Sequence, residues 1–306
     1  MVIVSVAAPY RGCAKGAQRH VNRTLDPEPG QRKGAHMPYL ETSDSVPLYY
    51  EDHGSGHTLL LIHGWTMNAE YWWQRNVSEL ANSHRVVALD LRGHGLSGKT
   101  AEGHTLAQYA RDVRHLITEL GLDGVTPVGW SMGTSVILNY FLQFGSDRLR
   151  SVVFMDQSPK FFSDEDWPYP LLGDFSPQAL TVFVQNVRYD RPGAVKPFLR
   201  ACFVEPPSAE TIDDMYAETT KTPTDAALSV WMDMSYMDLR PALSQVTVPA
   251  LLIYGAHSAV FPPGDLGSWL HEQIPDSKLA MFENSGHCPF WEEPERFNRE
   301  VVDFVG

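Results

Sequence analysis

The sequence predicts an α/β protein with a mostly parallel, doubly wound sheet and a helical lid inserted between two of its strands. From Val46 onward, apolar runs alternate with helical patterns, which is typical of parallel strands covered on both faces. Between 158 and 246 this alternation breaks, and the chain becomes rich in Pro, Trp, Met and Phe. We therefore expect a leader at 1–36, a core at 37–157 and 247–306, and a lid at 158–246.

The first half of the core contains clear strand and helix signals. The stretch "VPLYYEDHGSGHTLLLIHG" predicts two strands joined by a Gly-rich turn, and "RVVALDLRG" at 85–93 predicts a buried strand. Apolar residues at helical spacing over 105–121, followed by a glycine, predict a helix. The next strand, "VTPVGW", contains Pro127, which is unusual in a central strand because proline has no N–H to donate.

The remaining elements follow in the same order. A helix is expected over "TSVILNYFLQFG" and another over "PERFNREVVDFV" at the end of the chain. Three further strands are expected at 149–156, 248–255 and 277–287. A lid between two strands of one sheet would cover the carboxyl ends of the strands, where ligands bind in open α/β sheets.

Composition excludes several classes of protein. The 306 residues carry a formal net charge of −13, which disfavours nucleic acid as a partner because that affinity rests on cationic contacts to phosphate. The 3 cysteines have no paired spacing, so we expect neither a disulfide framework nor a thiolate metal site. No apolar run is long enough for a membrane helix. We expect a cytoplasmic enzyme without a metal or other cofactor. The basic residues of 1–25 leave a mitochondrial presequence open.

The stretch "PVGWSMGT" presents Ser131 in a G-x-S-x-G pattern between a predicted strand and a predicted helix. This pattern is typical of a sharp strand-to-helix turn that exposes a nucleophilic serine. A serine hydroxyl needs a base to accept its proton, and His287, after the last strand and Gly286, is the strongest candidate.

Four motifs in order make residues 46–306 resemble the α/β-hydrolase superfamily: "LLIHGW", "DLRGHGLS", "GWSMG" and "NSGHCPFWEEPERF". Within it, the chain is most similar to the serine esterase and non-haem haloperoxidase group. The resemblance implies that Ser131 is the nucleophile and His287 its base. It also implies that the backbone N–H groups of Trp65 and Met132 stabilise the oxyanion.

The acid of the superfamily usually follows the penultimate strand, and the aligned position here holds Ser258. Asp265 lies seven residues further on, beyond two prolines, and is too distant. Asp156, at the end of the strand after the nucleophile helix, is the better candidate, because some relatives carry their acid there. The alternative is that Asp156 only caps a turn at the start of the lid.

The sequence predicts a serine hydrolase that cleaves a carboxylic ester of a small to medium apolar or aromatic substrate through an acyl-enzyme. Lactonase and carbon–carbon bond hydrolase chemistry stay open, as does a non-catalytic ligand-binding protein, and the oligomeric state is not predicted. We expect four residues near the substrate, with His63 also holding the oxyanion loop: His63, Trp130, Trp167 and Trp231. His94 is expected to brace a turn, and His257 could serve either the pocket or its own loop.

Overall fold

The structure, a computed structural model, describes residues 38–262 and 264–306. The expected leader at 1–36, and the question of a presequence in 1–25, lie outside these residues. The described chain forms one eight-stranded sheet in the order β1-β2-β4-β3-β5-β6-β7-β8. Its strands are β1 Tyr39–Glu41, β2 Pro47–Gly54, β3 Thr58–Ile62, β4 Arg85–Leu89, β5 Thr126–Trp130, β6 Val152–Met155, β7 Ala250–Gly255 and β8 Ser277–Phe282.

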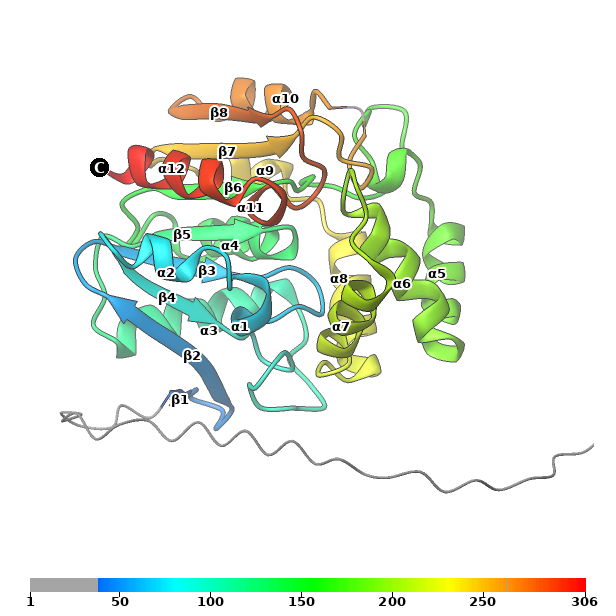
Figure 1. The fold of residues 1–306 in the computed structure, drawn as a ribbon, viewed down its shortest axis with the longest axis horizontal. Helices are drawn as coiled ribbons and strands as arrows, with labels where there is room; N and C mark the ends of the chain where they lie inside the picture. The colour runs from blue at the N-terminus through cyan, green and yellow to red at the C-terminus, as the bar shows by residue number, and fades with distance from the viewer. Residues whose placement is uncertain (1–37, 263) are drawn as a thin grey trace, which may run out of the picture. The chain divides into compact units, whose positions relative to one another are not determined.

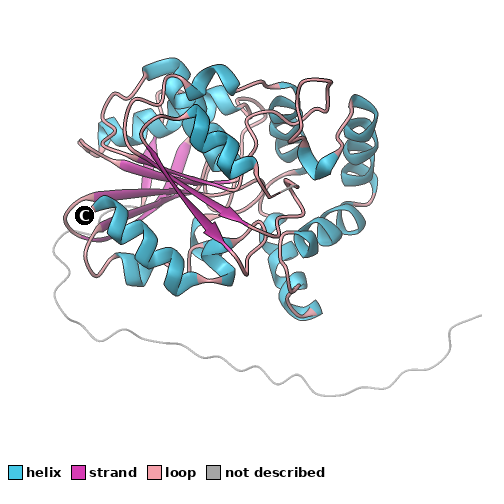
Figure 2. Ribbon diagram, turned by 90° about the horizontal axis from the view of Figure 1, so that it is seen from above, coloured by secondary structure: helices cyan, strands magenta, loops and turns pink. Residues whose placement is uncertain are grey.

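The predicted fold class is confirmed: β1 and β2 pair antiparallel, and every pair from β4 to β8 is parallel. Helices cover both faces of the sheet (Figure 2). Strands β3, β5, β6 and β7 are buried along their whole length, which explains their continuous apolar sequences. Strand β5 is central although it contains Pro127.

Two details of the sheet were not expected from the sequence. Strand β1 was not predicted, because it has only three residues, two of them exposed, and these leave little pattern. Strands β2 and β3 follow each other after a short turn, yet they do not pair, since β4 lies between them. The crossover puts β3 beside β5, and the loop after β3 therefore reaches the turn that follows β5.

The described core contains three helices that were expected from the sequence and four shorter ones that were not. They are α1 Ala69–Trp72, α2 Val77–Leu80, α3 Leu106–Glu119, α4 Met132–Phe144, α10 Leu266–Gln273, α11 Pro289–Glu292 and α12 Pro294–Val305. Helix α3 begins after Thr105, whose side chain accepts a hydrogen bond from the N–H of Gln108. Helix α4 begins immediately after Ser131.

The segment between β6 and β7 consists mainly of helices. They are the short 3-10 helix η1 Leu171–Gly173 and helices α5 Pro177–Tyr189, α6 Arg191–Ala201, α7 Ala209–Thr219, α8 Thr224–Tyr236 and α9 Arg240–Leu243. Helices α5 to α8 lie beyond the carboxyl ends of the parallel strands (Figure 1). This arrangement puts them over the sheet edge at which ligands bind in such folds.

Candidate active site

The turn between β5 and α4 holds Ser131 in a rare backbone conformation. Its φ is 53° and its ψ −121°, a strained region for a residue with a Cβ. The flanking glycines allow the turn: a Cβ on Gly129 would lie 2.6 Å from the backbone of Gly133, and one on Gly133 would lie 2.3 Å from the carbonyl oxygen of Ile62. Strand and helix can therefore approach closely only with glycine at both positions.

His287 lies in the loop between β8 and α11 and is 1% exposed. Two hydrogen bonds at the backbone of His287 hold this loop: its N–H donates to the Cys202 carbonyl at 2.9 Å, and the Trp130 indole donates to its carbonyl at 2.8 Å. The preceding N–H, of Gly286, donates to Glu292 at 2.8 Å. The imidazole is thus positioned by Trp130 next to Ser131, by Cys202 of the inserted segment and by Glu292 of α11.

Asp156 directly follows β6 and is completely buried, with a φ of 41°. Its Oδ1 lies 2.8 Å from Nδ1 of His287. The same oxygen accepts a hydrogen bond from the Ser258 hydroxyl at 2.8 Å, and Oδ2 accepts one from the Gly255 N–H at 3.1 Å. Three donors therefore satisfy this buried carboxylate, as a charge without water requires.

Ser258, at the position where the acid was expected, contacts Asp156 rather than the histidine. Asp265 lies at the start of α10 and interacts with Tyr169, outside this cluster. The cluster forms because the turns after β5, β6, β7 and β8 meet at one edge of the sheet, where these strands are neighbours in that order.

Ser131 and His287 line one narrow cavity whose free volume is only about 10 Å³, far below the ~300–1,000 Å³ of typical ligand pockets. Within the described part of the chain, no hydrogen bond joins the two side chains; such contacts often tighten only when substrate binds. The walls are largely apolar and aromatic: Trp65, Met67, Phe161, Phe198, Trp231 and Phe261.

The loop after β3 lies directly against Ser131. A Cβ on Gly64 would lie 3.3 Å from the Cβ of Ser131 and 3.1 Å from the Trp130 ring. The next residue, Trp65, is anchored by its indole, which donates to the Ala227 carbonyl of α8 at 2.8 Å. Met132 is the first residue of α4, so its N–H has no acceptor within the helix. Both expected oxyanion residues therefore border the nucleophile.

Two of the four residues expected near the substrate line the cavity, and two do not. Trp130 and Trp231 line the cavity, whereas His63 and Trp167 do not. His63 is fully buried, with Nδ1 2.8 Å from the Gly64 carbonyl and Nε2 accepting from the Leu91 N–H at 3.1 Å. These two hydrogen bonds hold the loop after β3 next to the turn after β4. The ring centroids of Trp167 and Trp269 are 4.9 Å apart, so Trp167 packs on α10 instead.

The other two histidines considered from the sequence have different environments. His94 is buried, with its Nδ1 3.0 Å from the Arg92 carbonyl within the turn after β4. Burial lowers the pKa of His94 well below its ordinary value, with a further contribution from His63. His257 is exposed, and its backbone N–H donates to the Ser285 carbonyl at 3.1 Å.

Several cavity residues were missed by the sequence analysis. Gln157, Phe161, Phe198, Cys202 and Phe261 all line the cavity. Phe161, Phe198 and Cys202 lie in the inserted segment and Phe261 in the loop after β7, where no sequence pattern fixes orientation. Gln157 alone carried a usable signal, since it directly follows Asp156 at the end of β6.

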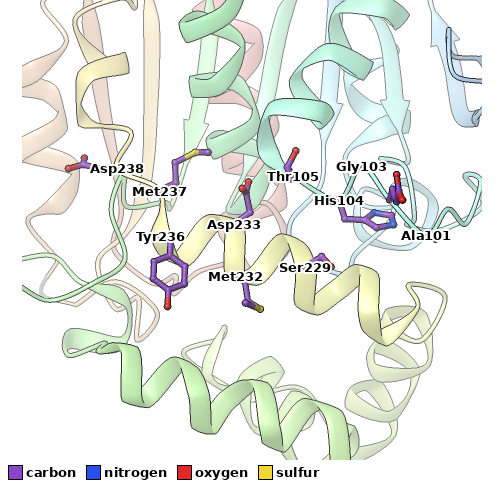
Figure 3. Close-up of a pocket in the computed structure, with 11 residues that line it drawn as sticks. Ala101, Gly103, His104, Thr105, Ser229, Met232, Asp233, Tyr236, Met237 and Asp238 are labelled. Carbon is purple, nitrogen blue, oxygen red and sulfur yellow. The ribbon is translucent and has the colours of Figure 1, made fainter.

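A second, more open cavity lies elsewhere on the molecule (Figure 3). It measures about 860 Å³ and lies between residues 101–105 and α8, with His104 and Asp233 among its lining residues. None of Ser131, Asp156 and His287 lines it, so the larger cavity is not where the reactive side chains meet. No group of three or more metal-ligating side chains occurs in 38–262 or 264–306. No helix of the described chain is long and apolar enough to cross a bilayer.

Comparison with known proteins identifies a family. Residues 57–294 match the family model of the alpha/beta hydrolase fold. The chain is 29% identical to a pimeloyl-[acyl-carrier protein] methyl ester esterase of Nitrosomonas europaea, over 82% of this chain and 96% of that protein. It is 26% identical to a non-heme chloroperoxidase of Kitasatospora aureofaciens, over 88% and 99%. A solved esterase of Exiguobacterium antarcticum superposes with a TM-score of 0.81 at 26% identity, over 87% and 98%.

Proposed function

Because the chain belongs to the α/β-hydrolase family, we propose that it is a serine hydrolase that cleaves carboxylic esters of small to medium, uncharged substrates. The observation that carries the proposal is the buried contact of 2.8 Å between His287 Nδ1 and Asp156 Oδ1, next to a strained serine in the same cavity wall. A nucleophile, a base and a carboxylate that orients the base are the parts that acyl transfer needs.

In the proposed reaction, Nε2 of His287 accepts the proton of Ser131 as Oγ attacks the ester carbonyl. The carboxylate of Asp156 holds Nδ1 protonated, so that Nε2 is the free base, and stabilises the imidazolium that forms. The N–H groups of Trp65 and Met132 would stabilise the oxyanion, each contributing about 3–4 kcal/mol to transition-state stabilisation. His287 then returns the proton to the leaving alcohol, and water releases the acid by the reverse sequence.

The walls of the cavity support the substrate class. The described residues that line it include no Lys, Arg, Asp or Glu, so a charged group would lose its hydration without a partner. The aromatic walls favour apolar or aromatic parts of a substrate instead. The similarity to an esterase and to a chloroperoxidase agrees with a serine nucleophile, and it does not identify the substrate.

The direct test is a burst of p-nitrophenol from p-nitrophenyl butyrate, in an amount equal to the enzyme, together with labelling of Ser131 by a fluorophosphonate. S131A should abolish both. A panel of lactones and of carbon–carbon bond substrates tests the two other chemistries that the same residues support. Absence of both burst and labelling in the folded protein would contradict the proposal and favour a ligand-binding role.

A further inference from the structure

Two polar atoms in the wall of the active-site cavity lack a partner. Among the described residues, Oε1 of Gln157 and Nε1 of Trp231 are buried without a hydrogen bond. The two residues are 1% and 3% exposed, and both line the cavity that contains Ser131 and His287. A buried polar atom without a partner is costly, and native proteins keep few of them.

Both side chains are held in place by their surroundings. The amide Nε2 of Gln157 donates to the Ser135 hydroxyl on α4 at 2.6 Å, which fixes the amide and leaves Oε1 as the unused atom. The Trp231 ring stacks on the Phe183 ring, with 4.5 Å between ring centroids, and packs against the Trp65 ring, with 4.7 Å between centroids. Neither residue can easily turn its free atom toward another protein group, so these atoms are preorganised for a ligand.

The two atoms differ in hydrogen-bonding character. The indole N–H of Trp231 can only donate, and the amide oxygen of Gln157 can only accept. A hydroxyl group can satisfy either atom, because its oxygen can accept from Trp231 and its hydrogen can be donated to Gln157. An ether or ketone would satisfy Trp231 alone, and an alkyl chain would satisfy neither.

We propose that Gln157 and Trp231 are specificity-determining residues that bind a hydroxyl group on the acyl part of the substrate, so that the preferred substrates are esters or lactones of short hydroxy acids. This inference rests on the proposed serine hydrolase activity and specifies its substrate class. Both residues line the narrow cavity that contains Ser131, so an acyl chain that reaches the nucleophile passes beside them. A site with polar atoms built to bind a hydroxyl discriminates strongly against the analogue that lacks it.

The test compares the p-nitrophenyl esters of butyrate, 2-hydroxybutyrate and 3-hydroxybutyrate. We expect the wild type to process one hydroxy ester with a kcat/KM at least about tenfold above that of the butyrate ester. Trp231→Phe, which keeps the ring and removes the N–H, should lower this ratio about tenfold, as should Gln157→Leu. A ratio that separates the substrates is not moved by a general loss of stability.

The matched control is Trp73→Phe, which removes another buried indole N–H without a partner, at a position that does not line the cavity. Its substrate ratio should equal that of the wild type. If the wild type hydrolyses all three esters equally well, this inference is overturned while the proposed function stands, and that result requires no variant to fold. If neither turnover nor labelling of Ser131 occurs, the proposed function itself fails.

Discussion

The carboxylate of Asp156 and the imidazole of His287 meet at 2.8 Å in the interior of the protein, although 131 residues separate them in the chain. Neither side chain is more than 2% exposed. Water therefore cannot substitute for the carboxylate, which is the side-chain partner that holds Nδ1 of the imidazole.

Replacing Asp156 with Asn should lower kcat by about 10⁴, because an amide in this place favours the wrong tautomer of the histidine. Steady-state hydrolysis of p-nitrophenyl butyrate measures the effect. The matched control is Asp265→Asn, whose carboxylate lies outside the cluster, and its kcat should stay close to that of the wild type. A near-normal rate for D156N would remove Asp156 from the mechanism.

The contact between Ser258 and Asp156 predicts that the acid can be relocated. Ser258 Oγ and His287 Nδ1 both lie 2.8 Å from the same oxygen of Asp156, so a carboxylate introduced by Ser258→Asp would come close to the imidazole. We expect D156N/S258D to recover at least about tenfold of the kcat lost in D156N, since orienting the base is what the carboxylate supplies. The same assay measures it, and a double variant no faster than D156N would contradict this prediction.

Gly133 has a packing role that can be measured by stability. A Cβ there would lie 2.3 Å from the Ile62 carbonyl oxygen, so Gly133→Ala should destabilise the protein by about 1–3 kcal/mol through overpacking. This loss opposes the gain of about 1 kcal/mol that alanine normally brings to a helix interior. Urea unfolding gives the value, and an unchanged or higher stability would show that β3 and α4 can separate.

The buried histidines predict a pH dependence of stability. Burial lowers the pKa of His63, and it lowers the pKa of His94 more strongly, so the folded protein keeps both neutral. The unfolded chain protonates each near its ordinary pKa of ~6.5 and thus binds more protons below that pH. The free energy of unfolding should be highest above about pH 6.5 and fall as the pH drops, by up to about 1.4 kcal/mol per pH unit for each histidine.

Urea unfolding at pH 7 and pH 5 measures this slope. His94→Gln should make it shallower, whereas His53→Gln, at an exposed position, should leave it unchanged. Equal stability at both pH values would show that neither buried histidine is linked to folding.

Periodicity, glycine spacing and motif order are local properties of the chain, and they were enough to predict the alternation of strands and helices, the turn around Ser131 and the base candidate His287. Tertiary structure decided which carboxylate faces the imidazole. Asp156 and Asp265 were the two acids that the sequence offered, and only the packing of the turns after β6, β7 and β8 brings Asp156 to His287 while Asp265 lies at the start of α10. It also decided that Trp231 and Gln157 line the cavity while His63 and Trp167 do not, since the inserted helices set these directions through contacts that no local pattern encodes.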